Sequence, residues 1–101
     1  MRVIKRDGRA ALYERGKIEA SIVNANNDVL ENERATGDEI ENIICYIEDL
    51  GKKRILVEDI QDIVEQKLIE IGRNNLAKEY VEYGNSNEKA NKVVMFDKIL
   101  A

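Results

Sequence analysis

The chain has 101 residues, a formal net charge of −4, no histidine and one cysteine, Cys45. This length fits one small domain, the missing histidine removes the commonest general base and metal ligand, and a lone cysteine forms neither an internal disulfide nor a zinc site. The isoelectric point near 4.9 argues against nucleic-acid binding through bulk charge, and no signal-peptide pattern or long apolar run is present, so we expect a cytoplasmic protein that contacts no membrane.

Residues 2–18 form a basic segment in this acidic chain, with six Lys or Arg and two acidic residues. Within it, Asp7-Gly8 separates two short runs, residues 2–5 and 9–14. An Asp-Gly pair in this setting predicts a β-hairpin with a type I′ turn, whose two central residues both take positive φ. The cations of such a hairpin could close over phosphates, or they could be solvated charges that discourage pairing at a sheet edge.

From Lys17 onward, apolar residues recur every three to four positions, which predicts a helix over roughly 17–31. Thr36 and Glu39 then have the spacing of a capping box, in which each side chain satisfies a free backbone amide at a helix start. We expect Gly51 in the left-handed conformation just past the end of this second helix. Its apolar face comprises Ile40, Ile43, Ile44, Ile47 and Leu50.

The second half of the chain reads as a short strand and two helices. Ile55–Val57 predict a third strand, and Glu58 and Asp59 suit the start of a helix that Gly72 ends. Its apolar stripe is Ile60, Ile63, Val64, Leu68 and Ile71. A fourth helix, over roughly 73–90, carries Leu76, Ala77, Tyr80 and Val81, and residues 84–87 are expected to fray or break it.

This order predicts an α+β fold, a small four-helix bundle capped by an N-terminal β-hairpin or three-stranded sheet. Residues 1–90 would form the domain. Residues 91–101 would be a tail or the start of a following segment.

Other candidate groups have simpler interpretations. Glu58, Asp59, Asp62 and Glu65 could hold magnesium or act as acids and bases, but helix-start and solvent-facing roles explain them. Cys45 has no histidine to activate it, and we expect it in or near the core. Tyr80 and Tyr83 could support an adenine ring. We expect Tyr80 in the core and leave Tyr83 open. The sequence contains neither a phosphate loop nor a dinucleotide fingerprint.

Two blocks of the sequence resemble the ATP-cone family. VIKRDGR at residues 3–9, followed by Lys17-Ile18, resembles its opening motif. VEDIQDIVE at residues 57–65 continues the resemblance in the same order, with Leu68-Ile69, Gly72, Ala77-Lys78 and Tyr80. The resemblance covers roughly residues 2–85. The wording of the second block is most like that of N-terminal cones of anaerobic, class III ribonucleotide reductases.

The resemblance implies a regulatory domain with no catalysis of its own. Such a domain binds ATP or dATP, with Mg²⁺, and controls the activity or oligomerisation of ribonucleotide reductase. Its partners would be the nucleotide and a reductase catalytic domain or another cone, with no nucleic acid. The chain would be free-standing or a fragment of a ribonucleoside-triphosphate reductase.

The resemblance also suggests site residues. By position, Val3, Lys5, Arg6 and Lys17 match residues that surround the nucleotide, and Asp7 and Gly8 match a lid-like turn. Lys5, Arg6 and Lys17 would neutralise the triphosphate. Val3 and Ile22 would offer apolar surface to the base.

Two other functions stay open. The family often has arginine after the tyrosine of the last helix, whereas Tyr83 is followed here by Gly-Asn-Ser-Asn, so a helical protein-interaction module with a degenerate nucleotide site is the main alternative. A small nucleotide hydrolase is disfavoured, because the basic segment has no obvious group to activate water.

Overall fold

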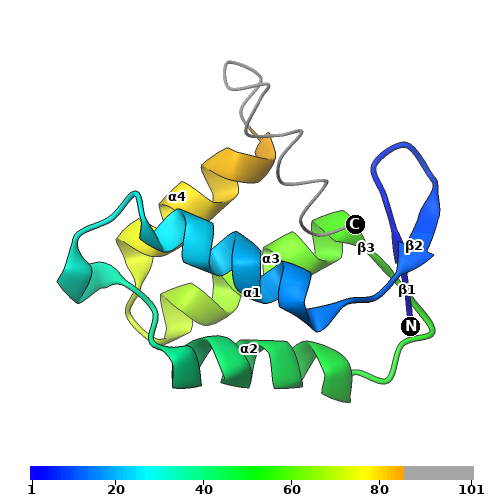
Figure 1. Cartoon of the computed structure of the whole chain (residues 1–101), viewed down its shortest axis with the longest axis horizontal. Helices are drawn as coiled ribbons and strands as arrows, with labels where there is room; N and C mark the ends of the chain where they lie inside the picture. Colours follow the sequence, from blue (N-terminus) through cyan, green and yellow to red (C-terminus); the bar gives the residue numbers. More distant parts are fainter. Residues whose placement is uncertain (86–101) are drawn as a thin grey trace.

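A three-stranded sheet lies at one side of four helices in the computed structural model, which describes residues 1–85 and the side chains of residues 1–82 (Figure 1). The α+β fold with N-terminal strands agrees with the prediction. In chain order the elements are β1 (Arg2–Ile4), β2 (Ala10–Leu12), α1 (Arg15–Asn26), a 3-10 helix (Glu31–Glu33), α2 (Gly37–Asp49), β3 (Arg54–Leu56), α3 (Val57–Glu70) and α4 (Asn74–Asn85).

The predicted hairpin is confirmed, but its predicted type I′ turn is wrong. The Gly8 N–H donates to the Lys5 carbonyl at 2.9 Å, and the Lys5 N–H donates to the Arg9 carbonyl at 2.8 Å. Gly8 has a φ of 89°. Every residue of positive φ within residues 1–85 is a glycine, so Asp7 does not have the positive φ that a type I′ turn requires. The loop therefore has three residues and ends in a left-handed glycine, which is the next most common way to close a hairpin.

The third strand joins the hairpin through a long-range contact. β3 pairs parallel with β1, with Val3 opposite Ile55, so β1 is the central strand in the order β2-β1-β3. Val3 and Ile55 are both buried, because alternate residues of a strand share a face and this face covers the helices. β3 lies one residue earlier than predicted, since Val57 already begins α3.

The first helix ends at Asn26, five residues before the predicted end. The buried Asn26 side chain explains this: its amide donates to the Ala35 carbonyl at 3.2 Å, and its oxygen accepts from the Ala35 N–H at 3.0 Å. A single side chain thus binds the returning chain to the end of α1. Val29, which continued the apolar period, still packs on the core although it lies outside the helix.

The second helix begins with the predicted capping box. Thr36 Oγ1 accepts from the Glu39 N–H at 3.2 Å, and Glu39 Oε1 accepts from the Thr36 N–H at 2.8 Å. Gly51 has a φ of 65°, as expected for the left-handed position after a helix. Leu50 and Ile71 were predicted on buried faces, but both are exposed, because each lies where its helix has ended and the core no longer covers it.

Tyr80 lies fully buried between α1 and the rest of the core, as predicted, and its hydroxyl lies 3.1 Å from Ser21 Oγ. The core is almost entirely aliphatic. Its largest fully buried side chains, besides Tyr80, are Ile18, Ile22, Ile44, Ile47, Ile60, Leu68, Leu76, Val3 and Val57.

The helix α4 continues through Gly84 to Asn85, where the described residues end. The Tyr83 side chain, whose role was left open, residues 86–87 of the expected break and the tail at 91–101 lie outside what the structure describes. Within residues 1–85, no helix is both long enough and apolar enough to cross a membrane.

Candidate functional site

The predicted site begins at the hairpin, which turns some of its cations toward the helices. Lys5 follows Val3 by two positions and is still paired with Arg9, so strand alternation places it on the inward, helix-covering side of the sheet. Its side chain is half-buried. Arg2 lies on the outer side and is exposed. The sheet therefore separates an inward cation from an outward one.

Arg6 joins the hairpin turn to two helices through Gln61. Its guanidinium Nη2 donates to Gln61 Oε1 at 2.8 Å, across a sequence separation of 55 residues. Gln61 lies on α3 and is 3% exposed. Its side-chain amide Nε2 lies 3.5 Å from the Val81 carbonyl of α4, a long hydrogen bond. The turn is thus held against α3, which in turn contacts α4.

The tip of the turn is organised by its own residues. The Asp7 carboxylate accepts from the Arg9 N–H at 3.1 Å and pairs with Arg9 Nε at 2.6 Å. The backbone hydrogen bond from Arg9 lowers the pKa of Asp7, and the Arg9 side chain lowers it further. Asp7 and Gly8 therefore shape the turn, and Arg9 is engaged locally.

Lys17 lies on the first turn of α1, where its Nζ pairs with Glu14 Oε2 at 3.1 Å. The structure thus brings Lys5 and Arg6 to the inward side of one turn and leaves Lys17 at the beginning of a helix that follows the hairpin.

Val3 and Ile22, the two apolar residues predicted to face a base, both lie in the core. Val3 is 1% exposed and Ile22 is fully buried. Their side chains are covered by other core residues in this structure. Val3 packs β1 on the core, and Ile22 packs α1 on it.

A polar cluster that the sequence did not reveal fixes the start of α1 on α2. Arg15 pairs with Glu41 at 3.0 Å and with Glu48 at 3.1 Å, and the Tyr13 hydroxyl donates to Glu48 at 2.8 Å. Partial burial, and then the hydrogen bond to Glu48, raise the pKa of Tyr13, while Arg15 lowers the pKa of Glu48. Cys45 is half-buried beside this cluster, with Sγ 3.9 Å from Arg15, and is therefore a partly covered structural residue.

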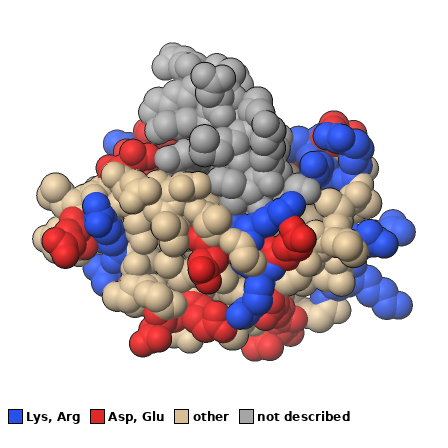
Figure 2. All heavy atoms as spheres, in the orientation of Figure 1, with Lys and Arg blue, Asp and Glu red and all other residues tan. Residues whose placement is uncertain are grey.

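The charges are distributed unevenly over the molecule. Figure 2 shows Lys and Arg gathered at the side where the hairpin and β3 lie, and Asp and Glu along the edge formed by α2. The parallel pairing adds to the basic side, because it places the exposed residues Lys53 and Arg54 beside Arg2. The fold thus enlarges the basic region already seen at residues 2–18.

The family model for the ATP cone domain matches residues 1–89. The chain belongs to the ATP-cone family. The alpha subunit of ribonucleoside-diphosphate reductase from Chlamydia pneumoniae is 33% identical over 97 aligned residues, which cover 87% of this chain. The chain spans about 9% of the length of that relative. The relative is a diphosphate reductase, so it does not bear on the predicted resemblance to class III cones.

ATP cones bind ATP or dATP in general, and they are regulatory domains without catalytic activity. Membership of the family confirms the resemblance on which the sequence interpretation depends. It does not by itself place the nucleotide on particular residues of this cone.

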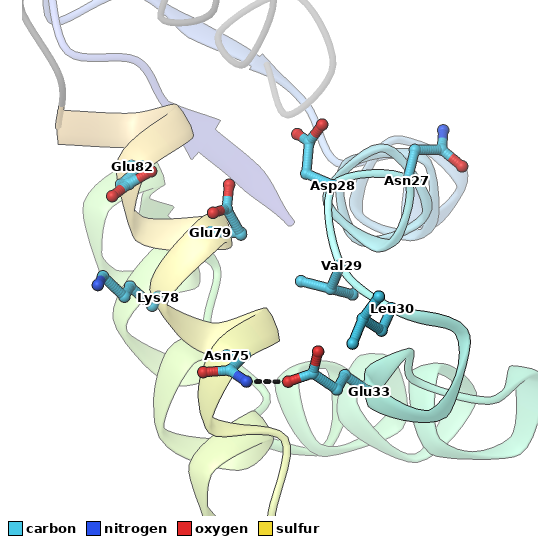
Figure 3. A pocket seen from close by; sticks show the side chains of 9 residues that line it. All are labelled: Asn27, Asp28, Val29, Leu30, Glu33, Asn75, Lys78, Glu79 and Glu82. Carbon is cyan, nitrogen blue, oxygen red and sulfur yellow. Dashed lines mark hydrogen bonds between the residues drawn. The ribbon is translucent and has the colours of Figure 1, made fainter.

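One cavity, lined by none of the hairpin residues, lies beside α4. It has a volume of about 510 Å³ and opens between the segment after α1 and the outer face of α4 (Figure 3). Its lining includes four carboxylates and one lysine, namely Asp28, Glu33, Glu79, Glu82 and Lys78. Figure 3 shows Val29 pointing toward α4, and Asn75 bonded to Glu33. Because these carboxylates would repel a triphosphate, this cavity does not suit one.

The paired carboxylates of the third helix lie where the simpler interpretation put them. Glu58 and Asp59 lie in the first turn of α3, where negative charge complements the helix dipole. Within residues 1–85, no group of three His, Cys, Asp or Glu side chains could hold a metal ion.

The sequence interpretation missed Gln61 as a candidate site residue, although a signal was present. Gln61 follows Val57 by four positions and precedes Val64 by three, so a polar side chain interrupts the buried stripe of α3. A polar residue on an apolar helix face needs a partner, and here the partner is Arg6.

Proposed function

We propose that this cone binds ATP or dATP at the inward side of its cationic hairpin and thereby regulates a ribonucleotide reductase. The observation that carries the proposal is the position of Lys5 and Arg6. Both emerge from the same turn, Lys5 on the side that covers the helices and Arg6 bonded to α3. A partly covered ammonium and a guanidinium on one turn suit a polyanion, because charge-assisted hydrogen bonds strengthen away from bulk water.

Lys17 would complete the phosphate site from the start of α1. The residue before this helix makes no side-chain capping bond, and Lys17 adds a positive charge at a helix N-terminus, where an anion is favoured. Ligand binding would require Lys17 to exchange Glu14 for a phosphate. Mg²⁺ would arrive with the triphosphate, which supplies its own oxygen ligands.

The base would then lie on the surface that covers Val3 of β1 and Ile22 of α1. Since both side chains are covered, we assign them an indirect role, in which they hold the floor of the site. Asp7 and Gly8 would act as the lid, because they form the tip of the turn that carries Lys5 and Arg6.

Regulation would follow from differential affinity. A nucleotide shifts the balance between two states of a protein only by the difference in its affinity for them. The cone would favour one arrangement with a reductase catalytic domain, or with another cone, when the nucleotide is bound. The reductase relative supports this role, which we place in the cytoplasm.

Calorimetric titration of the full chain with ATP and dATP, each with Mg²⁺, tests the proposal. We expect saturable binding that Lys5→Glu or Lys17→Glu weakens by roughly tenfold or more, since each reversal replaces an attraction with a repulsion at the phosphates. Lys52→Glu is the matched control, because Lys52 is exposed before β3 and the reversal changes the net charge equally. An absence of heat at high micromolar nucleotide, or equal losses in all three variants, would rule out the proposed site.

One observation favours the alternative of a protein-interaction module. The outer side of the sheet carries Leu12, 64% exposed, and Leu56, 45% exposed, on either side of β1. Exposed apolar groups on a sheet face suit a protein partner. A stable dimer whose melting temperature does not change with nucleotide would favour this function over the first.

A further inference from the structure

We propose that Gln61 is a positioning residue for nucleotide binding, which holds the Arg6 guanidinium in place for the phosphates. This inference rests on the proposed function, because it assigns a role at the same site. It starts from the 2.8 Å hydrogen bond between Arg6 Nη2 and Gln61 Oε1.

The burial of Gln61 makes it a fixed acceptor. Gln61 is 3% exposed and lies on the face of α3 that carries the fully buried Val57 and Val64. A buried amide is costly unless its polar atoms are bonded, and here the oxygen accepts from Arg6 while the nitrogen faces the Val81 carbonyl. The packing and these two contacts leave Gln61 little freedom. A long arginine side chain on an exposed turn is thus anchored to a rigid helix.

The chemistry of this bond suits an anionic ligand. A guanidinium has five N–H donors in a planar fork whose geometry suits phosphate oxygens, and the bond to Gln61 uses one of these donors. Gln61 is neutral, so this bond orients Arg6 without cancelling its charge.

Anchoring also lowers the cost of binding. A ligand that must immobilise a flexible side chain loses affinity in proportion to the freedom removed. An Arg6 already held on Gln61 has lost part of that freedom before the nucleotide arrives. Removing the acceptor should therefore weaken binding although Gln61 itself touches no phosphate.

The experiment measures ATP affinity, with Mg²⁺, for the full chain and four variants: Gln61→Met, Gln61→Glu, Arg6→Met and the double variant Arg6→Met/Gln61→Met. We expect Gln61→Met to weaken binding by about fivefold, as for one side chain that loses its order. Gln61→Glu should weaken it at least as much, because a carboxylate neutralises Arg6 and competes with the phosphate. In the Arg6→Met background, Gln61→Met should have no further effect.

The double variant separates positioning from a structural role. If Gln61 served only to pack α3, its substitution would weaken binding equally with or without Arg6, and that result would overturn the inference. Unchanged affinity in Gln61→Met would overturn it as well. If the wild type itself binds no nucleotide, the proposed function fails, and the two failures are thereby told apart.

A second measurement needs no substitution in the core. In the wild type, the side-chain NH₂ resonances of Gln61 should shift as ATP is added, because the partner of its oxygen is drawn toward the phosphates. In Arg6→Met, which changes an exposed residue, the same resonances should stay in place. Resonances that do not move in the wild type at saturating ATP would refute the inference even if Gln61→Met failed to fold.

Discussion

At the scale of single residues, Glu39 links two helix starts. Its carboxylate accepts from the Thr36 N–H, within the capping box of α2, and pairs with Arg73 at 3.2 Å just before α4. The hydrogen bond from the Thr36 backbone lowers the pKa of Glu39, and Arg73 lowers it further. The ionised form of one side chain thus holds together segments that are far apart in the sequence.

This arrangement predicts acid sensitivity. Because the pKa of Glu39 is lower in the folded state, its stabilisation is present above the ordinary glutamate value of 4.5 and is lost as the pH falls through the folded value. Glu39→Gln keeps a capping side chain but no charge. We expect the variant to be less stable than the wild type at pH 7, with the difference shrinking as the pH falls below about 4.5.

Urea unfolding at a series of pH values measures this difference. Glu31→Gln is a suitable control, since Glu31 is exposed. A difference between wild type and Glu39→Gln that stays constant down to pH 3 would contradict the role assigned to the ionised carboxylate.

At the scale of elements, two glycines of the same segment have opposite roles. Gly8 has a φ of 89° and ends the hairpin loop, whereas Gly16 lies in the first turn of α1, with no atom near the position a Cβ would take. Left-handed backbone disfavours any residue with a Cβ, while a helix disfavours glycine. One substitution therefore has opposite consequences at two positions eight residues apart.

We expect Gly8→Ala to lower the free energy of unfolding by about 1–2 kcal/mol. Gly16→Ala should raise it by about 0.5–1 kcal/mol. Thermal unfolding of both variants beside the wild type provides the measurement. Changes of the same sign would show that the turn or the helix start differs from the one described.

Local signals in the sequence predicted most elements. Asp7-Gly8 gave the hairpin and Thr36 with Glu39 gave the start of α2, because a turn or a cap is decided by a few neighbouring residues. The early end of α1 was missed, since it depends on the Asn26 amide meeting Ala35 across a loop. The turn type was missed for a similar reason: both I′ and three-residue loops accept the same Asp-Gly pair.

Contacts between distant segments could not be predicted from such signals. The parallel pairing of β1 with β3 joins segments that no periodicity connects, and so does the contact of Arg6 with Gln61. The cations of the candidate site were apparent from charge alone. The position of Lys17 at the start of the first helix was also predicted, whereas the contact of Arg6 with α3 required the fold.

At the scale of the whole molecule, one aliphatic core holds the sheet and all four described helices. Ile22 is fully buried at its centre, whereas its neighbour Val23 is 44% exposed. For a domain of this size the total stability is only about 5–15 kcal/mol, so one buried side chain is a considerable part of it. The stability of the sheet and of α1, which carry the candidate site residues, therefore depends on this core.

We expect Ile22→Ala to destabilise the fold by about 2–5 kcal/mol, through lost burial and the cavity left behind. Val23→Ala should change stability by no more than about 0.5 kcal/mol. Chemical unfolding monitored by circular dichroism measures both. A small effect of Ile22→Ala, combined with a large loss of nucleotide affinity, would instead favour direct contact between Ile22 and the base.

Because Val3 pairs with Ile55 in parallel strands, the sheet cannot be completed early in translation. The central strand is made well before the strand that flanks it, and at about 5–20 residues per second the ribosome needs roughly 3–10 s to produce the chain between them. Until then, β1 has only β2 as a neighbour, and a two-stranded hairpin is marginal in water. We therefore expect that a growing chain cannot bind nucleotide until both β3 and α3, the helix that carries Gln61, have emerged from the ribosome.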